Sequence, residues 1–70
     1  MWIRRTIDDY DFRIKQYCAK SKFGIDEGRI SKLEIWKDGE LLSQYDRGWV
    51  KKPRSAKVKA VFEEILRQHN

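Results

Sequence analysis

The amino-acid sequence predicts an α+β fold: a four-stranded antiparallel meander (ββββ) with one C-terminal helix packed on one of its faces. Apolar and polar residues alternate along most of residues 2–50, which is typical of half-buried strands. Two turn-forming pairs, Asp8-Asp9 and Asp38-Gly39, divide this stretch into hairpins. Toward the C-terminus the apolar residues change to helical spacing.

The length limits the architecture to one small domain. We expect it to cover residues 1–70, with the sheet at about 2–50 and the helix at about 55–68. Hydrophobic residues make up 40% of the chain, which is enough for a core and too many for a disordered segment. At this size only about 60% of the unfolded chain's surface can be buried, so self-association would enlarge a small core.

The first hairpin is expected from residues 2–18. Residues 2–7 alternate, and Asp8 and Asp9 then offer a two-residue turn, because Asp tolerates the positive φ angles of a type I′ turn. The second strand, residues 10–18, alternates clearly. Its inward-facing residues are expected to be Tyr10, Phe12, Ile14 and Cys18.

A loop and a second hairpin follow. Residues 19–28, with Gly24 and Gly28 as loop-forming residues, are expected to form a loop that contains positions of positive φ. Strands at 29–37 and 41–50 then flank the strongest hairpin signal of the chain, the Asp-Gly pair.

The helix begins after Pro53, which lacks an N–H and cannot continue a sheet. Ser55 can accept a hydrogen bond from the first helical turn. The apolar stripe that we expect the helix to bury consists of Val58, Val61, Phe62, Ile65 and Leu66.

The two faces of the sheet follow from the hairpin register. A two-residue loop places Trp36 opposite Leu41 and Ile35 opposite Leu42. Side chains alternate along a strand, so one face packs against the helix. Its expected core residues are Ile3, Ile7, Phe12, Ile14, Leu33, Ile35 and Leu42.

The second face is aromatic, aliphatic and basic at once, where a solvated sheet face would carry Thr, Ser, Lys and Glu. Trp49 belongs to it if no bulge interrupts the alternation, since a one-residue slip exchanges the faces. The expected stacking or interface residues are Trp2, Tyr17, Ile30, Trp36, Leu41, Tyr45 and Trp49.

Three interpretations of this second face remain open. Rings and cations on an open sheet can stack bases and hold phosphates. Trp, Tyr and Arg are also enriched at protein interfaces, with a target or with a second copy. In the third interpretation, long Lys and Arg side chains cover exposed rings and bind nothing.

The net charge of +5 is concentrated in one segment. Residues 41–60 hold six Lys or Arg and one acid, whereas the rest of the chain balances with ten of each sign. A local basic patch indicates an anionic partner, although it can also serve solubility alone. The candidate anion or nucleic-acid-binding residues are Arg4, Arg13, Lys15, Lys32, Arg47, Lys51, Lys52 and Arg54.

No pattern of catalytic or metal-binding residues is present. Cys18 is the one cysteine, and His69 is penultimate, so a Cys–His nucleophile pair is not expected. Asp8, Asp9 and Asp11 cluster, but no Glu completes a calcium loop, and a tight turn explains the first two. We therefore expect no enzyme, no catalytic residue, no metal and no cofactor.

The single cysteine allows no internal disulfide and indicates a reducing compartment. No apolar stretch is long enough for a signal peptide or a membrane span. We expect a complete chain in the cytoplasm, with no membrane partner.

Two motifs resemble a known group of proteins. "GRISKLEI" (Gly28–Ile35) and "YDRGW" (Tyr45–Trp49), with "SKFGID" upstream and a short helix after a Pro, resemble an uncharacterised family of small phage and prophage proteins of Gram-positive bacteria. The likeness covers the chain from about Tyr10 onward. Members tend to have Gly where this chain has Asp9, so the first turn can differ. The resemblance implies a phage setting and brings no known activity.

These observations favour a non-enzymatic, phage-type accessory protein. We expect it to bind an anionic partner, either nucleic acid or a small nucleotide, through the basic and aromatic face, in counter-defence. The alternative is a protein interaction module, or an inhibitor of a host protein, that self-associates through the same face.

Overall fold

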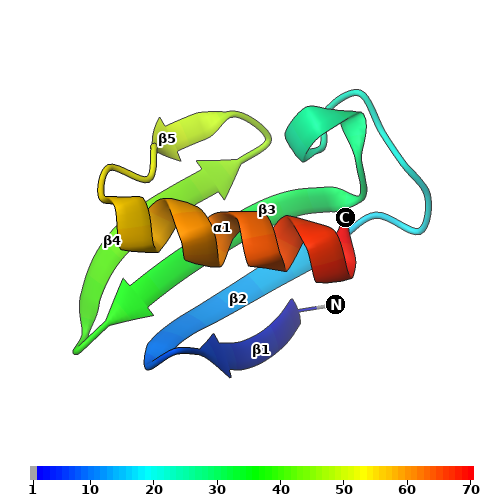
Figure 1. Ribbon diagram of the computed structural model, residues 1–70. Coiled ribbons are helices and arrows are strands. Elements are labelled where there is room, and N and C mark those ends of the chain that lie inside the picture. Colours follow the sequence, from blue (N-terminus) through cyan, green and yellow to red (C-terminus); the bar gives the residue numbers. More distant parts are fainter. Residues whose placement is uncertain (1) are drawn as a thin grey trace.

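The computed structural model describes residues 2–70, which form an antiparallel sheet crossed by one helix. Figure 1 shows the helix lying across one face of the sheet and leaving the other face uncovered. The strands pair in the order β1-β2-β3-β4-β5. The elements are β1 (Trp2–Ile7), β2 (Tyr10–Gln16), the 3-10 turn η1 (Ile25–Glu27), β3 (Ile30–Lys37), β4 (Glu40–Asp46), β5 (Trp49–Lys51) and α1 (Ala56–His69).

The expected four-stranded sheet is wrong, because the described residues form five strands. The chain turns after Asp46 and does not continue to residue 50. Arg47 and Gly48 have φ angles of 54° and 155°, and the Arg47 N–H donates to the Ser31 carbonyl at 2.9 Å. The turn sends residues 49–51 back along β4 as a fifth, edge strand. The remainder of the expectation, an antiparallel meander followed by one helix, agrees with the observed order.

Both short hairpin turns form where the sequence predicts them. Asp8 and Asp9 have φ angles of 47° and 66°, and Asp38 and Gly39 have 52° and 80°. Two consecutive positive φ angles are the mark of a type I′ turn, whose twist matches that of the flanking strands.

Bulges change the faces of the second hairpin. Trp36 pairs with Leu41 as expected, but Ile35 pairs with Ser43, so Leu42 is the extra residue of a bulge. Beyond it every side chain of β4 is on the opposite face from the expected one. Tyr45 therefore faces the helix and is 8% exposed, and its expected place on the open face is wrong.

A second bulge lies between β2 and β3. Lys15 pairs with Lys32, but Gln16 pairs with Ile30, which leaves Ser31 as the extra residue. Ile30 is consequently turned into the core and has no exposed surface. Its expected place on the open face is wrong for the same physical reason.

Trp49 also lies on the helix side, contrary to the expectation made for an unbroken strand. Its ring meets Tyr45 edge-on, with centroids 5.1 Å apart and planes at 85°. On its other side it lies 5.3 Å from the ring of Phe62 on α1. This aromatic contact joins β4, β5 and the helix.

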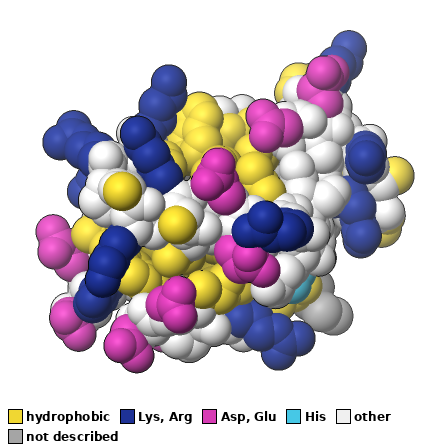
Figure 2. Space-filling view, in the orientation of Figure 1, with side chains coloured by type: hydrophobic (Ala, Val, Ile, Leu, Met, Phe, Trp, Pro, Cys, Tyr) yellow, Lys and Arg dark blue, Asp and Glu magenta, His cyan; other side chains and the backbone are white. Residues whose placement is uncertain are grey.

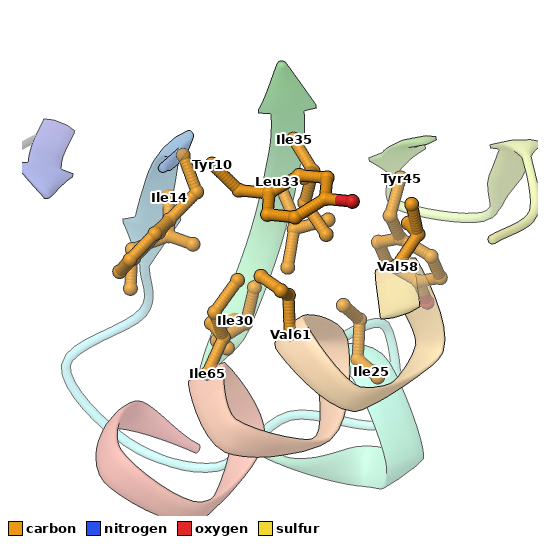
Figure 3. Packing of buried hydrophobic residues seen from close by; sticks show 11 residues of the cluster. Tyr10, Ile14, Ile25, Ile30, Leu33, Ile35, Tyr45, Val58, Val61 and Ile65 are labelled. Atoms are coloured by element: carbon orange, nitrogen blue, oxygen red, sulfur yellow. The ribbon is translucent and has the colours of Figure 1, made fainter. Parts of the chain in front are cut away.

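The core lies between the sheet and α1. Figure 3 shows Val58, Val61 and Ile65 of the helix pointing toward side chains of β2, β3 and β4. Ile3, Ile7 and Leu42 are only partly buried at its margin. The buried hydrophobic residues are Tyr10, Phe12, Ile14, Ile25, Ile30, Leu33, Ile35, Tyr45, Val58, Val61 and Ile65.

The helix begins as the sequence predicts. The Val58 N–H donates to Ser55 Oγ at 3.1 Å, which satisfies one of the free donors of the first turn. Three residues of the expected stripe are buried, and Phe62 and Leu66 pack against them at its edge. None of the helices in residues 2–70 has the length and apolar character needed to cross a membrane.

The last residue ties the helix to the loop before β3. The Asn70 side chain accepts from the Ile30 N–H at 3.1 Å and donates to the Ile25 carbonyl at 2.9 Å. Gln16 Nε2 donates to the His69 carbonyl at 2.5 Å. These bonds tie the end of α1 to β2, to β3 and to the loop before β3.

The expected loop with positions of positive φ is confirmed, although these positions are not its glycines, which provide space instead. Gly24 and Gly28 have φ angles of −82° and −99°, whereas Asp26 and Glu27 have positive values. A Cβ on Gly24 would collide with the Gly28 carbonyl. Cys18 in the preceding segment is exposed, because β2 ends at Gln16, and its expected burial is wrong.

Substituting Gly24→Ala is expected to lower the free energy of unfolding by roughly 1–3 kcal/mol, because the backbone must move to admit the methyl group. Urea unfolding measures the effect. Lys22→Ala in the same loop is the control, since its side chain is exposed and the change should stay within about 0.5 kcal/mol. If the two variants are equally stable, the loop can accept a methyl group at Gly24 and the explanation is wrong.

Stability is expected to fall on acidification in a way that depends on His69. Burial, and secondly the charge of Arg5, hold the pKa of His69 below its ordinary value. As the pH falls below about 6.5, the unfolded-state pKa, the unfolded chain binds more protons than the folded protein. The contribution of His69 to the free energy of unfolding is therefore fully present above that pH and is lost as the pH falls.

Thermal unfolding between about pH 7 and about pH 5 measures this dependence. A His69→Gln variant should show a shallower loss than the natural protein over the same interval. The explanation fails if both proteins lose stability with the same slope.

Candidate anion-binding surface

The open face is the side of the sheet that points away from α1. Its composition follows from the observed strand pairs, because directly opposite residues share a face. Arg4 lies opposite Arg13, Lys15 opposite Lys32, and Asp11 opposite Trp36. The residues of the open face are Trp2, Arg4, Thr6, Asp11, Arg13, Lys15, Lys32, Glu34, Trp36, Leu41, Gln44, Asp46 and Lys51.

Two like-charge pairs lie next to each other on this face. Arg4 and Arg13 are directly opposite across β1 and β2, and Lys15 and Lys32 are directly opposite across β2 and β3. Directly opposed like charges destabilise a sheet. Together the four side chains form a basic strip that crosses the first three strands. The strip consists of Arg4, Arg13, Lys15 and Lys32.

Carboxylates neutralise only part of this strip. Arg13 Nε donates to Glu34 at 2.5 Å, and this hydrogen bond, with the negative charge of Glu34, raises the pKa of the guanidinium. Lys32 Nζ lies 3.7 Å from Asp46. Within residues 2–70, Arg4 and Lys15 have no carboxylate within 4.0 Å. One cation of each like-charge pair is thus free to bind an anion.

Aromatic rings flank the strip. The Arg13 guanidinium lies 4.5 Å from the centroid of Trp2, so one face of that ring is already covered by a cation. Trp36 is half-buried between Asp11 and Leu41 in the register. Tyr17 follows the end of β2 and is half-buried near Lys15.

Two shallow hollows lie on the open face. One of about 310 Å³ is lined by side chains of Arg4, Asp11, Arg13 and Trp36. The other, of about 230 Å³, brings together Lys15, Tyr17, Lys32 and Arg47. Each hollow therefore combines at least two cations with one aromatic ring, the pair of groups that a nucleotide needs.

The remaining sequence-predicted cations lie apart from the strip. Lys51 belongs to β5 at the far edge, where its Nζ donates to the Leu41 carbonyl at 3.0 Å. Lys52 and Arg54 are exposed in the segment between β5 and α1, outside the sheet. Leu41 is half-buried on the open face beside Trp36.

The helix side differs in its charge pattern. Figure 2 views this side and shows Lys and Arg interspersed with Asp and Glu around the helix. A larger hollow of about 620 Å³ lies there between α1 and the β1–β2 turn. Lys37, Lys57 and Arg67 face it together with three acids, so its charges balance and it offers no net attraction to an anion. The acids are Asp8, Asp9 and Glu64.

A family model described as "Domain of unknown function (DUF7678)" matches residues 1–70. The chain belongs to this family. The expectation of an uncharacterised family is thereby confirmed. No curated protein and no solved structure matches the chain.

Two acids of the open face in this DUF7678 chain, Glu34 and Asp11, are absent from the set of site residues predicted from the sequence. Glu34 lies between the buried Leu33 and Ile35, so the strand alternation alone places it on the open face. Asp11 lies opposite Thr6 and Trp36, and alternation with the buried Tyr10 and Phe12 likewise places it on the open face. Among residues 2–70, His, Cys, Asp and Glu form no group of three that could hold a metal ion.

Substituting Lys15→Glu is expected to raise the free energy of unfolding by roughly 0.2–1 kcal/mol at low salt, because it replaces a cross-strand repulsion with an attraction to Lys32. Urea unfolding at low and high salt measures the gain, which salt should reduce. Lys20→Glu is the control, since it changes the net charge equally from the loop after β2. If both variants gain equally, net charge explains the effect and the pair does not.

Proposed function

We propose that this protein is a non-enzymatic binding protein that holds single-stranded nucleic acid or a nucleotide on its open face. The observation that carries the proposal is the two adjacent cross-strand pairs of like charge, Arg4 opposite Arg13 and Lys15 opposite Lys32. A face with a purely structural role gains nothing from such repulsion, whereas a bound phosphate would relieve it.

The geometry of the sheet suits a flexible, flat ligand. Neighbouring strands lie about 4.8 Å apart, so the strip presents cations and rings at short, regular intervals. Sheets that bind single strands use exposed aromatic rings for bases and nearby cations for the backbone. In this proposal Arg4, Lys15 and Lys32 neutralise phosphate, assisted by Arg13 and Arg47, while Trp36 and Tyr17 stack on bases.

The corrected fold narrows the set of residues that can take part. Ile30, Tyr45 and Trp49 lie on the helix side and leave the proposed surface. Lys51, Lys52 and Arg54 lie outside the strip and are proposed only as a distant contact for a longer strand.

A second candidate is recognition of an acidic protein, or self-association, through the same face. The observation in its favour is apolar exposure on the open face, since Trp2 on β1 is 38% exposed and Leu41 on β4 is half-buried beside Trp36. Aromatic residues of this kind are frequent at interface hot spots. This candidate predicts a stable complex with an acidic protein or with a second copy of the chain, and no preferential binding of nucleic acid.

The resemblance of residues 28–35 and 45–49 to small phage and prophage proteins supports a setting, which we also propose: the host cytoplasm, in counter-defence. Its test is phage growth on a host that defends itself with a nucleotide signal. Expression of the protein should restore growth, and a Lys15→Ala variant should restore less.

The binding proposal predicts that affinity for a short fluorescent oligouridylate falls steeply with salt. Lys15→Ala should weaken binding and reduce the slope of log affinity against log salt by about 0.7, the value for one lost phosphate contact on a single strand. Fluorescence anisotropy measures both quantities.

Lys59→Ala is the matched control, because it removes the same charge from the exposed surface of the helix. Affinity that stays constant from low to moderate salt would refute the nucleic-acid proposal. Equal losses in the two variants would show that binding depends on net charge and not on the open face.

A further inference from the structure

The hollow beside Trp36 contains an acid, which distinguishes it from a site made for phosphate alone. It is lined by Arg4, Asp11, Phe12, Arg13, Trp36 and Gly39. The Phe12 side chain is only 2% exposed and belongs to the core. The hollow, of about 310 Å³, therefore offers one ring, two cations and one carboxylate.

The Trp36 ring is available as a stacking surface. Within residues 2–70, neither a second aromatic ring nor a cation lies over it. The nearby Arg13 guanidinium covers Trp2 instead. A base that enters the hollow can consequently stack on this indole without displacing another group.

The Asp11 carboxylate is held beside the ring. Asp11 is the direct cross-strand neighbour of Trp36, and Thr6 Oγ1 donates to its Oδ1 at 3.1 Å. Within residues 2–70, no Lys or Arg forms an ion pair with it. Its Oδ2 and the remaining lone pair of Oδ1 are thus acceptors without a cationic partner. They repel phosphate and attract N–H donors.

The geometry points to this hollow as a guanine-binding subsite, an inference that rests on the proposed function and names its preferred base. Guanine presents N1–H and N2–H side by side on its Watson–Crick edge, and two adjacent donors match the two oxygens of a carboxylate. Adenine and cytosine offer one amino group there. Uracil offers one N–H between two carbonyl oxygens, and a carboxylate repels these oxygens.

The two arginines complete the site. Arg4 has no carboxylate within 4.0 Å among the described residues, so it can hold the phosphate next to a stacked guanosine. Arg13 is bound to Glu34 and contributes mainly charge. Together they offset the repulsion between Asp11 and the nucleic-acid backbone.

The test measures binding of short fluorescent oligouridylates of one length that differ only in their central base. Guanine at the centre is expected to bind roughly tenfold tighter than uracil, adenine or cytosine, the discrimination of one good bidentate pair. Hypoxanthine at the centre lacks only the N2 amino group, and it should lose most of this preference.

Variants assign the preference to its residues. Asp11→Ala should equalise the central bases without weakening binding of the all-uracil strand, because it removes a repulsive charge. Trp36→Leu should weaken binding of every strand by a similar factor. Circular dichroism confirms that each variant keeps the fold.

The outcomes separate the two proposals. Binding that is salt-sensitive but equal for all central bases, or a guanine preference that persists in Asp11→Ala, would overturn the guanine inference and leave the open-face proposal standing. Absence of binding to every strand would overturn both. A preference for guanine that depends on the N2 amino group and on Asp11 would support the inference.

Discussion

The bulge at Leu42 is the constraint on which the rest of the structure depends. One extra residue in β4 exchanges the faces of everything that follows it, and so brings Tyr45 and then Trp49 beneath the helix. There the rings of Tyr45, Trp49 and Phe62 form a continuous aromatic contact, and the Tyr45 hydroxyl donates to the Phe23 carbonyl at 3.3 Å. Without the extra residue, the rings of Tyr45 and Trp49 would lie on the open face, and the helix would lose their contact with Phe62.

The same exchange determines what remains on the open face. Because Tyr45 and Trp49 lie on the helix side, the tryptophans of the open face are Trp2 and Trp36. The bulge at Ser31 likewise places Ile30 on the helix side. The face that results is less apolar than an unbroken sheet would have made it, and its main feature is charge. Two pairs of directly opposed like charges favour the binding of an anion over packing against a second copy of the chain.

The sequence predicts the local features of this fold well, because their causes are local. The Asp-Asp and Asp-Gly turns, the Ser55 cap and the apolar stripe of the helix each depend on a few neighbouring residues. Site residues of the first hairpin, such as Arg4 and Lys15, lie on the predicted face, since a short turn fixes their register.

Errors begin at the bulges, whose stability comes from contacts between distant segments. No local pattern predicts that Tyr45 will meet the ring of Trp49, which in turn packs on Phe62 of the helix. The fifth strand was missed for a related reason: Gly48 marks a break, but only the pairing with β4 shows that the chain reverses there.

The order of strands in the sheet is the order of strands in the chain. Each new strand can therefore pair with the one just before it. Three of the four strand connections are two residues long, so their closure costs little entropy, and hairpins form in about 1–10 μs. Residues 17–29, between β2 and β3, form the one longer connection. We expect the docking of α1 to be the slower event, because the bulged strands form the surface that it covers. A chain of this topology is expected to fold quickly for its strand content, with the two Asp-containing turns as early centres of structure and the bonds of Asn70 among the last to form.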